Sequence, residues 1–168
     1  MQHIETVTVG SGGAASITFS AIAQDFTDLL LLFSLRADAN NVDGEILVNG
    51  SAGTARRLYG SGGGVASDAP ARITYLTTPS AATANTFGNG SAYFPNYTLA
   101  VAHSVSIDSV GENNGATAFQ NLSGNLTTST AAITSITIQG IAGVGLAEFS
   151  SASLYGITAG SDGIVAVS

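Results

Sequence analysis

The sequence predicts an all-β domain made of antiparallel strands. Apolar residues recur at every second position over much of the chain, which is the period of a strand that buries one face. β-branched residues crowd the same stretches, and Gly and Asn, which reach positive φ at little cost, separate them. This spacing of strands and turns is typical of a sandwich or a barrel.

Two short segments give a clear pattern of a half-buried strand. Ile17 and Phe19 alternate with hydroxyl-bearing residues, and Ile73 and Tyr75 alternate with polar ones. The Gly- and Asn-rich stretches between such segments predict chain reversals. We expect these turns at residues 10–13, 43–44, 49–50, 60–64, 88–90 and 113–115.

Residues 29–35 are almost all apolar, on both parities. Asp25 or Asp28 could cap a helix here, but the run is short and its neighbours are β-like, so we predict a strand covered on both faces. If one face packs in the core, the face that carries Leu30 and Leu32 needs a cover from a second element or a neighbouring subunit. For a chain of 168 residues, self-association is favoured over a third layer.

The longest alternating segment runs from Leu99 to Asp108. His103 falls on its apolar parity, between Val101 and Val105, and is the one ionisable ring that interrupts such a stripe. We predict a buried histidine, hydrogen-bonded or at a subunit contact, and keep a pH-sensitive contact as the alternative.

The last third of the chain repeats the strand pattern. Residues 131–138 predict a strand whose apolar phase slips between Ile133 and Ile136, as a β-bulge requires, and residues 148–157 predict another. We assign residues 1–158 to a single domain and residues 159–168 to a C-terminal tail. The tail ends in apolar residues that either add to a neighbour's sheet edge or fray.

Charge and composition exclude several classes of function. The chain has no lysine and only four basic residues, compared with eleven carboxylates, so its net charge is −7. Nucleic acids and anionic membranes are therefore disfavoured partners. With no cysteine, neither disulfides nor thiolate chemistry is available. Charged residues make up only 9% of the chain, which suits close contacts with other protein.

Three patterns resemble chemical sites without satisfying their requirements. Asp108 with Glu112, which we expect to flank a turn, and Asp25 with Asp28 are carboxylate pairs, but neither belongs to a glycosidase motif and the chain has no Trp. Residues 38–45 resemble a calcium loop, but the glycine is one place late, so we predict a polar turn. We expect no enzyme activity and no catalytic, cofactor or metal site.

The only basic doublet is Arg56–Arg57, and Tyr59 follows it closely. The doublet could reach an acidic patch on a partner or on a symmetry mate; the alternative is a pair of solvated charges at a strand edge. No basic start or apolar core of a signal peptide opens the chain. We therefore expect a product made, unprocessed, in a host cytoplasm.

Seven segments carry a resemblance to a known family. They are ETVTVGSGGAASITF, RRLYG, ANTFGNG, YFPNY, SVSIDSVGENNGATAFQ, AAITSITI and SSASLYGI. The set spans nearly the whole chain, from Ile4 to Ile157, and resembles small structural proteins of tailed bacteriophages. The resemblance implies an antiparallel jelly-roll β-sandwich that trimerises. Its members serve as capsid decoration (cement) proteins or as terminal domains of fibres.

Because strand-forming sequence begins at Ile4, we expect a free-standing decoration protein rather than a fibre tip. It would bind the major capsid protein on the virion exterior as a homotrimer and stabilise the head. The alternative is a receptor-binding domain of a tail or head fibre that recognises host-surface glycans. Its stacking rings would come from Tyr59, Tyr75, Tyr93, Tyr97 or Tyr155. The interface residues that we expect are Leu30, Leu32, Arg56, Arg57, Tyr59 and His103.

Overall fold

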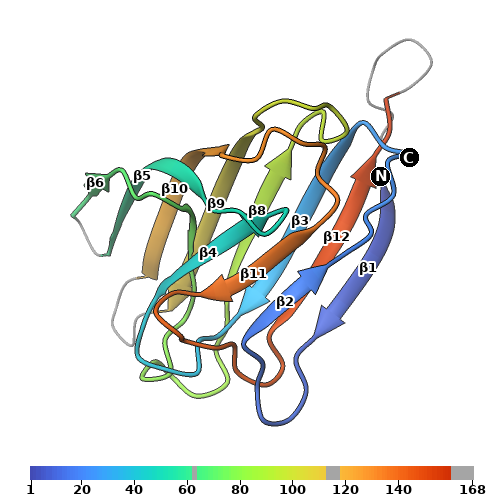
Figure 1. The fold of residues 1–168 in the computed structure, drawn as a ribbon. Coiled ribbons are helices and arrows are strands. Elements are labelled where there is room, and N and C mark those ends of the chain that lie inside the picture. Colours follow the sequence, from blue (N-terminus) through green and yellow to red (C-terminus); the bar gives the residue numbers. More distant parts are fainter. Residues whose placement is uncertain (62–63, 113–117, 160–168) are drawn as a thin grey trace.

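The structure, a computed structural model, describes residues 1–61, 64–112 and 118–159. In these ranges the chain forms strands and no helix, so none is present there that could cross a bilayer. The all-β prediction is confirmed. The strands form two antiparallel sheets (Figure 1).

The larger sheet has eight strands and the smaller one has four. In spatial order, the large sheet comprises β1 (Gln2–Thr8), β12 (Ser151–Ile157), β3 (Asp28–Leu35), β8 (Gly88–Phe94), β9 (Ser104–Glu112), β10 (Ala118–Thr127), β5 (Gly53–Ser61) and β6 (Ala66–Asp68). The small sheet comprises β2 (Ser16–Phe19), β11 (Ile136–Gly140), β4 (Asp43–Val48) and β7 (Ile73–Leu76).

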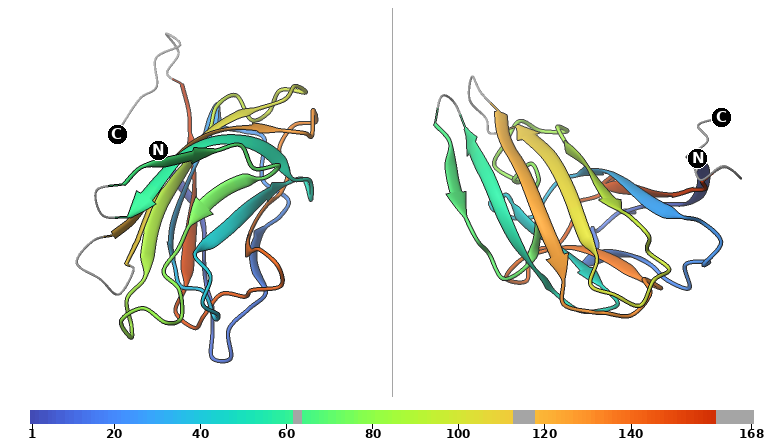
Figure 2. Two further views of the ribbon diagram at one scale, coloured as in Figure 1. Left: turned by 90° about the vertical axis from the view of Figure 1, so that its left-hand side faces the viewer. Right: turned by 90° about the horizontal axis from the view of Figure 1, so that it is seen from above.

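The small sheet packs against one face of the large sheet, and the core lies between them (Figure 2). β7 contacts β5, β9 and β10, while β2 contacts β12 at the other end. Alternate residues of β3, including Leu29 and Leu31, are fully buried there with Ile46 and Ile138 of the small sheet. We call the opposite face of the large sheet, turned away from the small sheet, the outer face.

The apolar run at 29–35 is a strand, as predicted, but only one of its faces is covered. Phe33 and Leu35 point into the core, whereas Leu30 is half-buried and Leu32 is 39% exposed on the outer face. No third layer from the described residues lies over it. The described residues supply no second cover, so the favoured cover by a neighbouring subunit stays a prediction.

Two strands begin later than the alternation predicts. β9 starts at Ser104, and Leu99 is exposed because residues 96–99 form a turn in which the Leu99 N–H donates to the Asn96 carbonyl. β11 starts at Ile136, so residues 131–135 form no bulged strand. Ile133 is nevertheless buried, because its N–H donates to the Tyr97 carbonyl and draws the segment onto the core.

Two of the predicted turns are confirmed, and two others fall inside strands. Residues 10–13 and 49–50 are turns; Asn49 and Gly50 have φ of 52° and 72°, and the flanking residues exchange two hydrogen bonds as in a type I′ hairpin. Residues 43–44 and 88–90 instead lie inside β4 and β8. Gly44 is needed there because the Tyr75 ring occupies the space of a side chain.

The remaining turn predictions concern the ends of hairpins. Gly60 and Ser61 belong to β5, and the segment that follows includes residues 62–63, outside the described residues. The predicted turn at 113–115 lies outside them too. So does the tail from residue 160 onward, which leaves its role a prediction.

Candidate functional site

The polarity of β10 is inverted relative to an ordinary half-buried strand. Its outer-face residues include Leu122, which is 61% exposed, and Leu126, which is 47% exposed. Its core-facing residues are polar and almost fully buried. These are Asn121, Ser123, Asn125 and Thr127.

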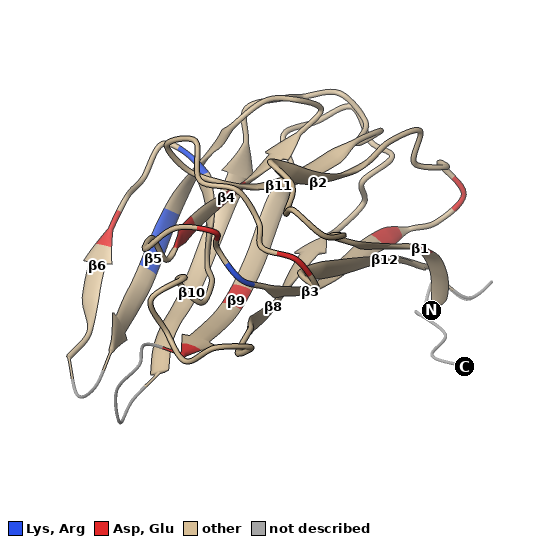
Figure 3. Ribbon diagram, turned by 90° about the horizontal axis from the view of Figure 1, so that it is seen from below, with Lys and Arg blue, Asp and Glu red and all other residues tan. Residues whose placement is uncertain are grey.

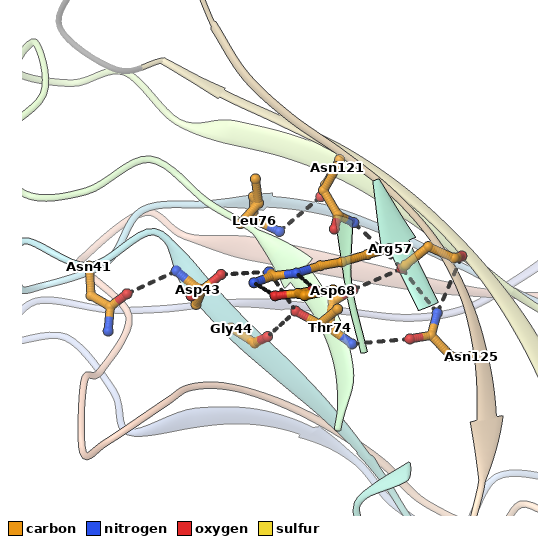
Figure 4. A network of polar contacts seen from close by, with 11 residues as sticks. Asn41, Asp43, Gly44, Arg57, Asp68, Thr74, Leu76, Asn121 and Asn125 are labelled. Atoms are coloured by element: carbon orange, nitrogen blue, oxygen red, sulfur yellow. Dashed lines mark hydrogen bonds and ion pairs between the residues drawn. The ribbon is translucent and has the colours of Figure 1, made fainter. Parts of the chain in front are cut away.

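The buried polar side chains act as a strand partner for β7. β7 pairs with β4 along one edge only. Along its other edge, the Asn125 Oδ1 accepts the Thr74 N–H at 3.2 Å and the Ser123 hydroxyl donates to the Thr74 carbonyl at 3.1 Å (Figure 4). The Ser109 hydroxyl of β9 likewise accepts the Leu76 N–H at 2.9 Å. Main-chain groups that would otherwise be buried without partners are thus satisfied.

Arg57 extends this polar layer into β5. Its guanidinium donates two hydrogen bonds to Asp68 of β6, at 2.7 and 3.0 Å, and one to Asp43 of β4 at 2.8 Å (Figure 4). The bond to Asp68 raises the pKa of Arg57 and lowers the pKa of the Asp68 carboxyl. Arg57 is only 9% exposed and also lies over the Tyr59 ring. It ties the two sheets together and is not the solvated charge of the alternative interpretation.

The outer face of the large sheet carries exposed apolar side chains from β3, β5, β9 and β10. They are Leu32, Leu58, Val110, Leu122 and Leu126, each more than a third exposed. The outer face of the small sheet differs, since Thr18 bonds Thr137 and Gln139 donates to Glu45 across it. Charged residues are sparse over both sheets (Figure 3). The outer face of the large sheet is therefore the apolar surface of the molecule.

Several hollows lie on this face. One of about 420 Å³ is lined by Arg56, Leu58, Leu122 and Gly124 together with Asp68, and it shares residues with two others. The smaller of these two, of about 450 Å³, is lined by Leu58, Val110 and Leu122 together with Tyr59. The larger, of about 740 Å³, crosses β5, β10, β9 and β8 toward the other end of the strands. Its lining includes Arg56, Tyr93, Ser106, Gly124 and Leu126.

Five of the six predicted interface residues fall in two places. Leu30, Leu32 and Arg56 lie on the outer face. Arg57 is buried between the sheets, with Tyr59 beneath its guanidinium. Whether any of them meets another chain stays a prediction.

His103 is buried, as predicted, with 2% exposure. It lies just before β9, where its backbone N–H donates to the Thr127 hydroxyl at 2.9 Å. Its Nε2 has no hydrogen-bond partner among the described residues. The histidine therefore packs in the interior, and the predicted subunit contact remains untested.

Sequence reasoning missed Leu58, Leu122 and Leu126 as surface residues. The alternation of β10 is plain in the sequence, but ordinary patterning would turn its leucines inward. The orientation of β10 is set by the free edge of β7, whose main-chain groups bond the polar side chains that β10 turns inward. That contact depends on which strands become neighbours, so it is absent from local sequence.

Of the five tyrosines considered for glycan stacking, two are unavailable. Tyr75 and Tyr97 are fully buried. Tyr93 is half-buried, and its hydroxyl donates to the buried Asp28 at 2.6 Å, which raises the pKa of Tyr93 to about 12. The hydrogen bond fixes the ring on the outer face.

The candidate carboxylates are engaged in local contacts. Asp108 and Glu112 both lie in β9 rather than on either side of a turn, and Asp108 accepts the Ser91 hydroxyl. Asp38 accepts the Gly145 N–H at 2.9 Å. Within the described ranges, no group of three or more His, Asp or Glu side chains could hold a metal ion.

No known protein family, curated protein or solved structure is detectably similar to the chain. The outer face therefore has to be interpreted from its own geometry.

Proposed function

We propose that the chain is a capsid decoration protein, which binds the major capsid protein on the outside of a phage head as a homotrimer and reinforces the shell. The observation that carries the proposal is the inversion of β10, which exposes leucines on the outer face and buries amides and hydroxyls behind it. Burial of such a face against another protein is favourable, because it removes apolar surface from water. The segments that resemble phage structural proteins supply the class of partner.

The outer face has the composition of a protein-binding surface. Complete burial of a leucine side chain contributes about 1.5–3 kcal/mol, and Leu122 is still 61% exposed. Few charged side chains lie on the outer face as a whole, although Asp108 lies opposite Leu122 and Arg56 is nearby, so covering the face desolvates few ions. Symmetry would repeat these modest contacts over a shell, where avidity multiplies them.

The order of the strands supports a jelly roll as the finer topology. In the small sheet, β2 lies beside β11 and β4 beside β7. Neighbours far apart in sequence are what two interleaved Greek keys produce. In this interpretation β9 and β10 are a strand pair inserted beside β8.

Capsids stripped of accessory proteins test the proposal. We expect purified protein to bind them saturably and to raise their disruption temperature. Leu122→Ser should weaken binding at least about tenfold, because it removes one well-covered apolar contact. Leu47→Ser, in the small sheet, is the matched control and should bind like the wild type. Absence of saturable binding by the wild type would refute the decoration role.

A further inference from the structure

Gly124 is in the middle of β10 without any steric reason supplied by the fold. Every other strand glycine of the described ranges would clash if it carried a Cβ. Those residues are Gly44, Gly53, Gly60, Gly88, Gly90, Gly111, Gly140 and Gly156. A Cβ at Gly124 meets nothing within 4 Å, and the backbone there is not in the positive-φ region.

A glycine inside a strand is destabilising, by about 0.5–1 kcal/mol relative to alanine. A strand glycine often marks a bulge, a tight bend or a place where a ligand or another backbone approaches closely. The register of β10 is unbroken at Gly124, so it does not lie at a bulge. Gly124 forms the floor of the larger hollow on the outer face, and its cross-strand neighbours there are Arg56 and Ser106. The missing side chain keeps this floor open.

The walls of the hollow combine one cation with hydroxyls and a fixed aromatic ring. Arg56 is exposed and makes no ion pair within the part of the chain that the structure describes. Ser104 and Ser106 supply hydroxyls on one side. Tyr93 contributes its ring, whose hydroxyl is already committed to Asp28. No carboxylate belongs to the lining among the described residues.

We propose that this hollow binds a carboxylated saccharide, with a sugar ring over Gly124, its apolar face against Tyr93 and Leu126, and its carboxylate on Arg56. Arg recognises a carboxylate through two parallel N–H donors. The serine hydroxyls suit a ligand that carries many hydroxyls of its own. The site adjoins the leucines to which the proposed function assigns shell docking, since Leu122 is two residues from Gly124 along β10. Saccharide titration and capsid binding test the two roles separately.

A peptide strand fits the hollow less well. The main-chain groups of β9 and β10 are paired in their own ladders on both sides, so the floor offers no backbone donors or acceptors. A bound peptide would leave its own amides without partners there. A saccharide needs only the side chains that line the walls.

Calorimetric titration with tetragalacturonate and its methyl ester tests the site at about 0.15 M salt, where the repulsion from the net charge of −7 is screened beyond about 8 Å. We expect wild type to bind the acid at least about tenfold more tightly than the ester. Arg56→Gln should remove this preference. Gly124→Val should abolish binding of both probes while the protein stays folded, because its side chain fills only the hollow.

Gly10→Val is the matched control, since Gly10 is exposed in a turn with open space around it. It should bind like the wild type. The proposal is overturned if the wild type binds neither probe at millimolar concentration, or if Gly124→Val binds unchanged. It is also overturned if Gly124→Val abolishes self-association while neither probe binds, because the hollow would then be a protein contact.

Discussion

At the scale of single residues, Arg57 holds β4, β5 and β6 together through Asp43 and Asp68. Arg57→Met leaves both carboxylates without their cation. We expect the free energy of unfolding to fall by about 2 kcal/mol, below the full value for a buried pair because Asp43 and Asp68 are 30% and 38% exposed. Urea denaturation measures it. Arg56→Met should change stability by less than about 0.5 kcal/mol; equal losses would refute the distinction between the two arginines.

The same ion pair gives a pH dependence of known sign. Because Arg57 lowers the pKa of Asp68 in the folded protein, the stabilisation is fully present above the unfolded pKa, about 4. It is lost as the pH falls through the lower, folded pKa. Arg57→Met should therefore lose less stability than wild type on acidification below about pH 4. Parallel denaturation series at several pH values compare the two proteins, and identical acid profiles would contradict this assignment.

Gly124 should limit stability rather than support it. Gly124→Ala is expected to raise the free energy of unfolding by about 0.5–1 kcal/mol, which corresponds to a Tm increase of roughly 1–4 °C for a domain of this size. Gly44→Ala is the contrasting variant and should destabilise, since its methyl group would collide with the Tyr75 ring. Differential scanning calorimetry resolves both effects. A destabilised Gly124→Ala protein would show that the fold itself requires this glycine.

At the scale of elements, β10 reverses the usual order of mutational sensitivity. Asn125→Leu removes the acceptor of the buried Thr74 N–H, so we expect a loss of about 2 kcal/mol. Leu122→Asn changes an exposed side chain and should cost less than about 0.5 kcal/mol. Chemical denaturation of the two variants gives the comparison. If Leu122→Asn were the more damaging change, the inverted orientation of β10 would be wrong.

The contrast between β3 and β10 explains how much the sequence alone could predict. In β3, the apolar run at 29–35 correctly predicted a strand, because strand propensity is a property of the segment itself. In β10, burial follows hydrogen bonding, since Ser123 and Asn125 serve the free edge of β7. Local patterns carry the first kind of information. The second requires knowing which strands meet in space.

The candidate site was predictable only in part, for the same reason. Arg56 is on the outer face beside a hollow, in keeping with a contact role, but its neighbour Arg57 is turned inward to Asp43 and Asp68. Alternation along β5 separates the two, and the sequence does not say which one faces the core. Gly124 gave no signal, because a strand glycine becomes informative only when its surroundings are known to be empty.

At the scale of the whole molecule, a sheet of eight strands is covered on one face by a sheet of four, and apolar side chains remain on the other. Leu32 lies on β3 and Leu122 lies on β10, so the exposed side chains span several strands of the outer face. A surface of this kind is stable in solution when other protein covers part of it. The proposed homotrimer and the proposed shell contact would share this role.

Sedimentation equilibrium over a wide concentration range tests this central claim most directly. The account predicts that the wild-type protein has about three times the monomer mass of 16.7 kDa, and that Leu32→Ser shifts the equilibrium toward monomer while the fold is retained. Leu47→Ser, on the small sheet, should leave the mass unchanged. A wild-type protein that is folded and monomeric at every concentration would contradict it.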